Sequence, residues 1–432
     1  MSDEGLRIGP AGGLTGELAV PGDKSVSHRA VLVGAISSGS VNVRGFGASA
    51  DTLSTVAAVR ALGVEVERAG ETELVVHGVG LRGLRAPSEP VDVGNAGTLI
   101  RLLPGILAGQ AGTFELTGDA SIRSRPMERI ADPLRRMGVD IETTDGRPPI
   151  RIAATGQTGA ISYELPVASA QVKSCVLLAG LYTDRGVTEV REPIPTRDHT
   201  ERILRAAGVP VDRGMGRVAV SPVQELHLDD VDVPGDFSSA APFIVAATAL
   251  AGSNLTLRDV GVNPTRTGLL TVMERMGARV GVFRRRLASG EPVADIEVRP
   301  AELVAADVEP ELVPLLVDEL PLVALLACFA HGVTTIRGAG ELRFKESDRI
   351  AATATALNAV GGHVEPLDDG FRIRGVPTRL RGGNVDAAGD HRVAMLGAVA
   401  GVCSQEGVEV HGADVLGVSF PDFADRLAAV SA

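Results

Sequence analysis

The sequence predicts a mixed α and β fold built from six copies of one unit. The first observation is a recurring pattern: a short apolar strand, a turn of Gly, Asp, Asn or Ser, an apolar helix, a Gly, and a β-rich strand. The second is spacing, because copies recur roughly every 70 residues and fill the chain, as repeat architectures do. The third is a second helix between copies, with a polar start, apolar residues at helical spacing and a Gly stop.

The elements follow one another in a regular order along the chain. The copies begin near Ala19 and at Val91, Leu165, Val231, Leu316 and Val385. The segments that contain the second helices begin at Ser49, Pro126, Arg197, Asn263 and Lys345. The last copy ends differently, in SFPDFADRLAAVSA at 419–432. Each unit therefore contains about two helices and several strands, as expected of a mixed class.

Composition excludes several classes of protein. Of 432 residues, 44% are hydrophobic and 22% charged, which excludes wholesale disorder. Aromatic residues make up only 3%, so the core must consist of Val, Leu, Ile and Ala, and base stacking on exposed rings is disfavoured. The net charge of −12 also argues against a nucleic-acid partner or an anionic membrane surface.

The chain carries no recognisable membrane or export signal. Its longest apolar stretches, 240–252 and 320–330, are shorter than the ~20 residues that span a bilayer. The acidic start MSDEGLRIGP has no apolar signal region, so we expect a cytoplasmic protein. The cysteines at 175, 328 and 403 stand singly in apolar runs. We expect buried thiols in a reducing compartment, without a disulfide framework or a cysteine zinc site.

The helix starts suggest an anion site. Their Ser, Asp, Asn and Gly residues cap free backbone N–H groups, and a helix N-terminus carries about half a positive charge. Six similar units around a centre could direct several such ends to one place. Most caps simply end helices, so this signal alone leaves a structural role open.

Lysine is rare in this sequence. The 42 basic residues include only Lys24, Lys173 and Lys345. Because lysine offers a compact ammonium that can lose its proton, its few positions suggest sites where arginine cannot serve. Lys24 and Lys345 lie among polar residues at helix starts, which favours function. Lys173 lies inside an apolar helix, and both function and chance survival stay open for it.

Other polar clusters admit a functional and a structural interpretation. Gly94–Thr98 places small residues at a helix start, where a ligand could approach the backbone. Arg101 could reach an anion or merely a carboxylate. The segment 119–126 reads as a mobile loop with two arginines. Asp318 and Glu319 precede an apolar helix, where carboxylates serve either as caps or as a general base. No Walker A loop and no GxSxG elbow appears. No metal-ligand spacing appears either, so we expect no metal.

Nine motifs in order resemble one family, the 5-enolpyruvylshikimate-3-phosphate synthases. They are PGDKSVSHR, GNAGTLIR, GDASIRSRPMERI, ASAQVKS, RDHTERIL, VPGDFSSAAPF, VDELP, ELRFKESDRI and GDHRVAM. The resemblance covers about residues 6 to 427. It implies the two-lobed enolpyruvyl transferase fold, an inverse α/β barrel with six βαβαββ units, three in each lobe. One lobe would be 21–234 and the other 1–20 with 235–432, with the active site in the cleft between them.

The resemblance also implies the reaction. The enolpyruvyl (1-carboxyvinyl) group of phosphoenolpyruvate passes to the 5-hydroxyl of shikimate 3-phosphate and phosphate leaves. This transferase step serves the shikimate pathway to chorismate and the aromatic amino acids. It needs no cofactor. We expect a monomer, because the composition shows no partner surface.

Site residues follow from the same motifs. The resemblance implies catalytic roles for Asp318 (which accepts the hydroxyl proton), Glu346 and Lys24 (which protonate the methylene carbon). It implies that shikimate 3-phosphate is bound by Lys24, Ser25, Arg29, Ser169, Ala170, Gln171, Arg197, Asp318 and Lys345. It implies that phosphoenolpyruvate is bound by Lys24, Gly97, Arg125, Gln171, Arg349 and Arg392. Some members also carry a lysine near the C-terminus, where this chain has Val418.

Two alternatives remain to be weighed. UDP-N-acetylglucosamine enolpyruvyl transferase shares the fold, but its loop carries a reactive Cys where this chain has Ala120. A non-catalytic anion-binding protein could use the same scaffold. Such a protein gains nothing from Asp318 and Glu346, because carboxylates repel anionic ligands.

Overall fold

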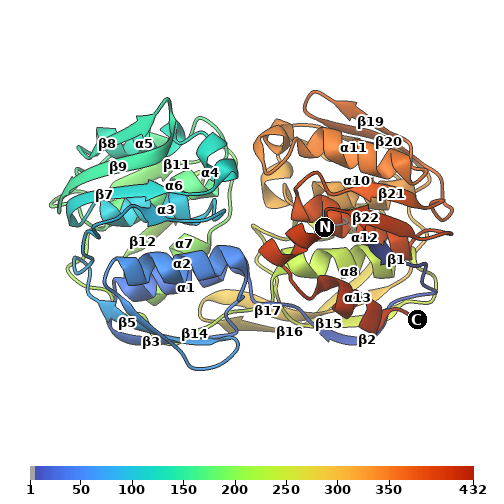
Figure 1. Ribbon diagram of the computed structural model, residues 1–432, viewed down its shortest axis with the longest axis horizontal. Coiled ribbons are helices and arrows are strands. Elements are labelled where there is room, and N and C mark those ends of the chain that lie inside the picture. The colour runs from blue at the N-terminus through green and yellow to red at the C-terminus, as the bar shows by residue number, and fades with distance from the viewer. Residues whose placement is uncertain (1–4) are drawn as a thin grey trace. The chain divides into compact units, whose positions relative to one another are not determined.

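The computed structural model describes residues 5–432 and divides the chain into two compact units, each with its own hydrophobic core. The N-lobe consists of Gly22–Pro234 and Leu287–Glu291. The C-lobe consists of the described part of Met1–Pro21, with Gly235–Arg286 and Pro292–Ala432. The expected division had placed residues 287–291 in the second lobe. Figure 1 shows both units, and each is described below by itself.

The N-lobe contains three four-stranded sheets. The first has the order β14 (Val231–Asp232), β3 (Ser38–Arg44), β5 (Glu73–Val79), β4 (Glu65–Arg68). The second has the order β6 (Val91–Asp92), β7 (Ala111–Thr117), β9 (Arg147–Thr155), β8 (Asp140–Thr144). The third has the order β10 (Ser162–Glu164), β11 (Thr188–Arg191), β13 (Arg217–Val220), β12 (Val211–Gly214). In each sheet the first strand pairs in parallel and the others antiparallel, so one unit is repeated three times.

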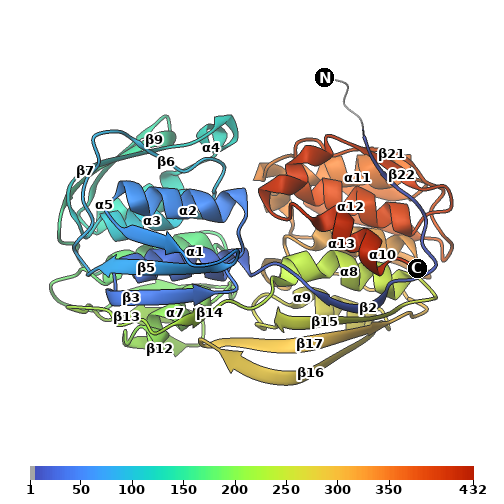
Figure 2. The same cartoon turned by 60° about the horizontal axis from the view of Figure 1, so that its bottom comes forward.

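Three buried helices form the centre of this lobe: α1 (Lys24–Ala35), α3 (Leu99–Leu107) and α6 (Ala170–Gly180). Helices that are apolar on all sides are typical of a core. Figure 2 shows α1 against the sheet of β3 and β5. The remaining helices are α2 (Ala50–Ala61), α4 (Ala120–Ser124), α5 (Glu128–Arg136) and α7 (His199–Ala206).

The C-lobe repeats this plan with three further sheets. One has the order β16 (Arg279–Ala288), β17 (Glu291–Arg299), β15 (Asn254–Gly261), β2 (Thr15–Ala19). Another has the order β18 (Gly332–Ile336), β20 (Gly370–Gly375), β19 (Val364–Leu367). The last has the order β1 (Leu6–Ile8), β22 (Val408–His411), β21 (Gly383–Asp386). The six sheets confirm the predicted six units and the mixed α and β class.

Three buried helices again lie at the centre: α8 (Phe237–Ala249), α10 (Leu320–Cys328) and α12 (His391–Val402). The other helices are α9 (Gly268–Arg275), α11 (Arg349–Ala359) and α13 (Phe423–Val430), with 3-10 turns η1 (Val313–Leu315), η2 (Gly340–Phe344) and η3 (Ala413–Val418). Cys175, Cys328 and Cys403 are all buried, as predicted, and burial raises the pKa of each thiol to about 12.

The first and fourth copies exchange their opening strands. β2, which precedes the helix of the first copy, pairs in parallel with β15 of the fourth copy. β14, which opens the fourth copy, pairs in parallel with β3 of the first. Both exchanges occur where the chain passes from one lobe to the other. Gly22 stands at one such point, where a Cβ would lie 1.8 Å from the carbonyl oxygen of Gly45, so the crossing requires a glycine.

Within residues 5–432, no helix combines the length and the apolar character that a bilayer crossing demands.

Candidate active site

Helix α1 presents the first group of predicted residues. Asp23 caps it, because its carboxylate accepts the N–H of Val26 at 2.9 Å. The ammonium of Lys24 lies 2.8 Å from Asp51 and its side chain remains partly exposed. One turn along, His28 is fully buried, and its Nδ1 lies 2.6 Å from the hydroxyl of Thr55. Burial holds the pKa of His28 well below its ordinary value, so this imidazole is neutral at pH 7.

Arg29 is buried but has neutral hydrogen-bond partners. Its Nε donates to the hydroxyl of Thr200 at 2.6 Å, and its two terminal nitrogens donate to Ser174 Oγ at 3.1 Å and to the backbone oxygen of Ser25 at 2.9 Å. Burial lowers the pKa of Arg29 to about 10, and the charge of Glu201 partly offsets this. The guanidinium is therefore charged at pH 7 without a bonded carboxylate, which suits an anionic ligand.

The starts of α3 and α6 are tied together by Arg101. Its Nη1 donates to Gln171 Oε1 at 2.9 Å and to the carbonyl of Gly97 at 3.3 Å, and Gln171 donates to Thr98 Oγ1 at 3.2 Å. Arg101 thus contacts the side chain of Gln171, a residue predicted to bind both substrates. Ser169 caps α6, accepting the N–H of its third residue.

Arg125 lies against Gly97. A Cβ at Gly97 would lie 2.6 Å from Nη1 of Arg125, so only glycine leaves this guanidinium in place. The other terminal nitrogen donates to Ser121 Oγ at 3.2 Å and Asn95 Oδ1 at 3.4 Å. The prediction of a loop over 119–126 was wrong in part: Ala120–Ser124 forms the short helix α4, because Asp119 accepts the N–H of Ile122 and caps it.

Lys173 serves the core rather than a ligand. It is fully buried, 2.7 Å from Glu201 and 3.1 Å from Glu192. Its ammonium also donates to the carbonyl of Thr196 at 3.3 Å. An uncompensated charge at this depth would be very costly, which explains two carboxylates around one lysine.

In the C-lobe, Arg349 joins three carboxylates. Its Nε lies 2.7 Å from Asp390 and its Nη1 lies 3.3 Å from Asp318, while its Nη2 pairs with Glu346. The Arg349 side chain is only 2% exposed. Burial alone would lower the pKa of Arg349, but Glu346, Asp390 and Asp318 together raise it above its ordinary value. This guanidinium is permanently charged and fixes the two carboxylates predicted to be catalytic.

Two more cations surround Asp318. Lys345 Nζ lies 3.9 Å from Oδ1, and Arg392 Nη2 lies 3.7 Å from Oδ2. Arg392 Nη1 also donates to the backbone oxygen of Asp318 at 3.2 Å. The sequence allows Asp318 to serve either as a helix cap or as a general base. The structure places three cations within 4.0 Å of it.

Glu319 precedes α10, but its side chain makes no capping hydrogen bond. The cap role that the sequence allows for it is therefore not observed. It is fully buried and pairs with Arg266 at 2.9 Å, and both contact the hydroxyl of Ser238. Ser238 accepts a further hydrogen bond from Arg392 Nη1 at 3.2 Å. Sequence reasoning missed Arg266 and Ser238. The only signal was their position at the polar starts of two helical segments.

The predicted residues thus fall into two groups, one in each lobe. The N-lobe holds Lys24, Ser25, Arg29, Gly97, Arg125, Ser169, Ala170, Gln171 and Arg197. The C-lobe holds Asp318, Lys345, Glu346, Arg349 and Arg392. In the N-lobe group, Arg29 contacts Ser25, and Gly97 lies against Arg125 and shares Arg101 with Gln171. In the C-lobe group, all five residues are joined by ion pairs through Asp318 and Arg349. Within residues 5–432, no three His, Cys, Asp or Glu side chains are grouped as a metal site would require.

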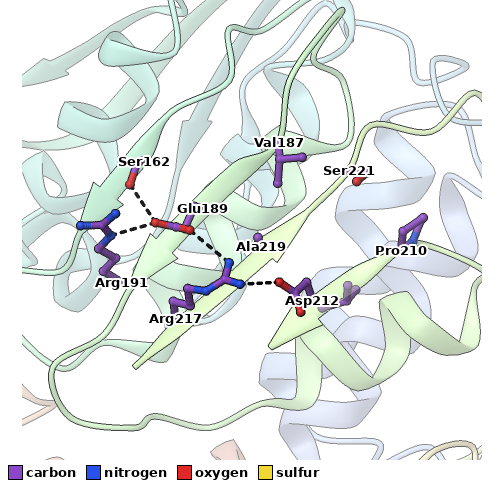
Figure 3. A pocket seen from close by; sticks show the side chains of 10 residues that line it. Ser162, Val187, Glu189, Arg191, Pro210, Asp212, Arg217, Ala219 and Ser221 are labelled. Carbon is purple, nitrogen blue, oxygen red and sulfur yellow. Dashed lines mark hydrogen bonds and ion pairs between the residues drawn. The ribbon is translucent and has the colours of Figure 1, made fainter. Parts of the chain in front are cut away.

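A hollow of about 730 Å³ lies elsewhere in the N-lobe, over the sheet of β10–β13 (Figure 3). It contains none of the predicted residues. Its charges are mutually paired: Glu189 contacts Arg191 at 2.8 Å and Arg217 at 3.2 Å, and Arg217 contacts Asp212 at 2.7 Å. Paired surface charges offer little to a ligand, so the helix starts are the better candidate.

Comparison with known proteins identifies the family. The family model of EPSP synthase (3-phosphoshikimate 1-carboxyvinyltransferase) matches residues 8–427. The chain belongs to the EPSP synthase family. The 3-phosphoshikimate 1-carboxyvinyltransferase of Methylococcus capsulatus is 48% identical over 96% of this chain and 95% of its own length. That of Acidithiobacillus ferrooxidans is 50% identical over 96% and 95%.

Solved structures agree with this assignment. The EPSP synthase of Acinetobacter baumannii superposes with a TM-score of 0.88 at 42% identity, covering 98% of this chain and 97% of that one. The enolpyruvyl transferase NikO of Streptomyces tendae has a TM-score of 0.79 at 21% identity, covering 98% and 96%, which is a likeness of fold. The enolpyruvyl transferase fold and the carboxyvinyltransferase activity of the shikimate pathway, both predicted from the sequence, are confirmed.

Proposed function

We propose that this EPSP synthase binds shikimate 3-phosphate chiefly through its N-lobe group and carries out proton transfer through its C-lobe group. The observation that carries this proposal is the sharing of Arg349 by Asp318 and Glu346. One buried guanidinium thereby holds two carboxylates in a fixed relation. Fixed acid and base groups beside bound reactants supply typically 10²–10⁴-fold of rate.

Shikimate 3-phosphate would meet a buried cation with neutral hydrogen-bond partners, Arg29, in the N-lobe. Arg29 donates to two hydroxyls and a carbonyl, all of them neutral. An anionic oxygen of the substrate would be the first charged acceptor of its hydrogen bonds. Lys24 and Arg197 add positive charge nearby, since the charge of Arg197 lowers the pKa of Arg29 and that of Lys24 lowers the pKa of His28. Ser25, Ser169, Ala170, Gln171, Asp318 and Lys345 complete the proposed set.

Phosphoenolpyruvate would use guanidinium groups from both sets. Arg125 beside Gly97, and Arg349 and Arg392 in the C-lobe, provide the planar donors that carboxylate and phosphate accept in pairs. A substrate carboxylate at Arg349 would compete with Glu346 for the same nitrogens. Binding would therefore weaken the Arg349–Glu346 pair and leave Glu346 easier to protonate.

The reaction then proceeds in two stages. Asp318 accepts the proton of the 5-hydroxyl as its oxygen attacks C2 of phosphoenolpyruvate, while Glu346, assisted by Lys24, gives a proton to the methylene carbon. A tetrahedral intermediate results. In the second stage Glu346 takes a proton back from the methyl group and the C2–oxygen bond to phosphate breaks. Phosphate leaves with the proton that Asp318 accepted, so both carboxyl groups return to their starting states.

Asp318→Asn tests this assignment. We expect kcat to fall by about 10²–10⁴-fold, because the base is lost. The dissociation constant of shikimate 3-phosphate should rise much less, because asparagine keeps the shape of Asp318 and can still hydrogen-bond the substrate. Asp386→Asn, an exposed carboxylate of the same lobe, is the matched control. Phosphate release is measured with shikimate 3-phosphate and with UDP-N-acetylglucosamine as acceptor, without added metal.

Each alternative outcome points to a specific error. Equal losses of turnover and binding in Asp318→Asn would give Asp318 a binding role only. Release with the sugar nucleotide alone would mean that the loop at Ala120 was misinterpreted. Binding without any turnover of the wild type would favour a non-catalytic anion-binding protein.

We further propose a monomeric cytoplasmic enzyme. Its three buried free thiols suit a reducing compartment. Its exposed large apolar residues are dispersed among many elements, from Leu53 to Val376. A mass of about twice 44.6 kDa by light scattering would contradict the monomer.

A further inference from the structure

Helix α7 begins with four consecutive buried polar residues. Asp198, His199, Thr200 and Glu201 are 1%, 3%, 1% and 0% exposed. They directly follow Arg197, a proposed ligand of shikimate 3-phosphate. Buried polar side chains are costly unless they are paired, and four in a row at a helix start demand an explanation.

Each of the four contacts a different part of the N-lobe. Asp198 pairs with Arg213 at 2.6 Å and with Arg202 at 2.8 Å. Glu201 pairs with Lys173 of α6 at 2.7 Å. The start of α7 is therefore a polar junction, which we define as residues 198–201, and it fixes the orientation of the segment that carries Arg197.

Thr200 connects the junction to Arg29. Its hydroxyl accepts the Nε–H of Arg29 at 2.6 Å and lies 2.6 Å from the hydroxyl of Ser174. Ser174 in turn accepts from Nη2 of the same guanidinium at 3.1 Å. Two linked hydroxyls thus hold one edge of Arg29, so a change at Thr200 would alter the direction in which the guanidinium presents its other N–H groups.

His199 connects the junction to a segment from much later in the chain. Its Nδ1 lies 2.8 Å from Oε1 of Glu291, and both side chains are buried. Glu291 follows a two-residue turn between β16 and β17, in which Ser289 and Gly290 both have positive φ, as a type I′ hairpin requires. The tip Leu287–Glu291 belongs to the N-lobe, although most of the hairpin belongs to the C-lobe.

Further hydrogen bonds hold the hairpin tip against other residues of the N-lobe. Arg202 Nη1 donates to the carbonyl of Gly290 at 2.9 Å, and the hydroxyl of Ser289 accepts the N–H of Asp232 at 2.9 Å. The charge of Glu291 also raises the pKa of Arg29, which places this carboxylate electrically near the substrate-binding cation. Three consecutive residues of the tip, Ser289, Gly290 and Glu291, thus all contact other residues of the N-lobe.

We propose that Thr200 and Glu291 are positioning residues for shikimate 3-phosphate. Through the polar junction they fix the guanidinium groups of Arg29 and Arg197, and the hairpin tip completes the N-lobe substrate site. This inference rests on the proposed function of that site. Neither residue needs to touch the substrate, since each acts through an arginine.

The test compares Thr200→Val with Thr200→Ser, and Glu291→Gln with Glu297→Gln. Valine keeps nearly the shape of threonine without its hydroxyl, while serine keeps the hydroxyl. Glu297 lies on the same strand, pairs with Arg299 at 2.8 Å and is half-exposed, so it is the matched control. Titration calorimetry of the full chain gives the dissociation constant of shikimate 3-phosphate, and steady-state kinetics give both KM values and kcat.

We expect Thr200→Val to weaken shikimate 3-phosphate binding roughly 10–100-fold, since hydrogen bonds to charged groups are lost. Glu291→Gln should weaken it roughly tenfold, and Thr200→Ser and Glu297→Gln should stay within about threefold of the wild type. The KM for phosphoenolpyruvate should change much less than that for shikimate 3-phosphate.

The proposal would be overturned by unchanged affinity in both Thr200→Val and Glu291→Gln. It would also be overturned if both KM values rose equally together with a lowered melting temperature, because that is a general structural effect. Wild-type turnover with shikimate 3-phosphate is measured first. Its absence would refute the proposed function, and this inference with it.

Discussion

Arg29 and Arg349 are both buried guanidinium groups, yet their surroundings are opposite. Arg29 donates to two hydroxyls and a backbone carbonyl, whereas Arg349 pairs with Asp318, Glu346 and Asp390. Burial lowers the pKa of Arg29 to about 10. The three carboxylates more than offset burial for Arg349 and raise its pKa.

The contrast shows two ways in which a protein can balance the charge of a buried guanidinium. In the N-lobe the balancing charges belong to the cluster of Lys173, Glu192 and Glu201. Lys173 and Glu201 are the sequence neighbours of Ser174 and Thr200, which accept hydrogen bonds from Arg29. That arrangement leaves Arg29 available to an incoming phosphate. In the C-lobe the carboxylates bind the guanidinium directly. Under the proposed function a substrate must compete with them, which would couple its binding to the groups proposed to transfer protons.

The largest expected effect is that of Lys173→Met in the N-lobe. It leaves two buried carboxylates without their cation, and breaking such a cluster costs about 3–5 kcal/mol of unfolding free energy. The double variant K173M/E201Q should recover at least half of this loss, because one uncompensated charge is removed. Urea unfolding, fitted with a separate transition for each lobe, gives the values.

Arg151→Met is the control for that experiment. It breaks a solvent-exposed ion pair of the same lobe, with Glu142 at 3.4 Å, and should cost no more than about 1 kcal/mol. If Lys173→Met behaved like Arg151→Met, the N-lobe would not depend on a separate charge cluster, and the contrast with Arg349 would lose its basis.

Much of the fold could be predicted because each repeat carries its pattern locally. Strand, polar turn, apolar helix and Gly recur, and the structure confirms six sheets. The repeat pattern alone does not predict the exchange of β2 and β14, because pairing partners of short strands depend on contacts far apart in sequence. The lobe boundary that the family resemblance implies, 21–234 against 1–20 with 235–432, does place both strands in the lobes where they pair.

The candidate site was predictable to a different extent. Motifs point to residues such as Arg349 and Asp318, and the family resemblance assigns them roles. Glu319 and Thr200 lie within the motifs VDELP and RDHTERIL, but the resemblance assigns them no role. An acidic residue or a threonine at a helix start usually serves as a cap. Their roles come from partners 53 and 171 positions away, Arg266 and Arg29, and only the folded chain brings these together.

A smaller effect is expected for Asp390→Asn, which tests the C-lobe side of the comparison. Asparagine keeps the shape and can still accept the N–H of Arg392, but it removes one of the three charges on Arg349. Loss of a hydrogen bond between charged groups costs about 1.5–3 kcal/mol of unfolding free energy. The KM for phosphoenolpyruvate should rise as well, because Arg349 loses its most buried partner.

Glu309→Gln provides the comparison for Asp390→Asn. It removes an exposed partner of Arg275 in the same lobe, at 2.6 Å, and should cost no more than about 1 kcal/mol. A cost for Asp390→Asn as small as that of Glu309→Gln would show that Arg349 is held by Glu346 and Asp318 alone.

The smallest effect concerns acid, and it sharpens the same comparison. Burial alone would raise the pKa of Asp390, but the charge and hydrogen bonds of Arg349 outweigh it and hold the pKa below its ordinary value. A carboxylate with a lowered folded-state pKa stabilises the fold fully above its unfolded pKa, about 3.9 for Asp, and loses this contribution as the pH falls further. The difference in C-lobe stability between the wild type and Asp390→Asn should therefore be constant from pH 7 to about pH 5 and shrink below about pH 4. Urea unfolding at each pH measures it, and a difference that stayed constant or grew in acid would show that Arg349 does not stabilise the ionised form of Asp390.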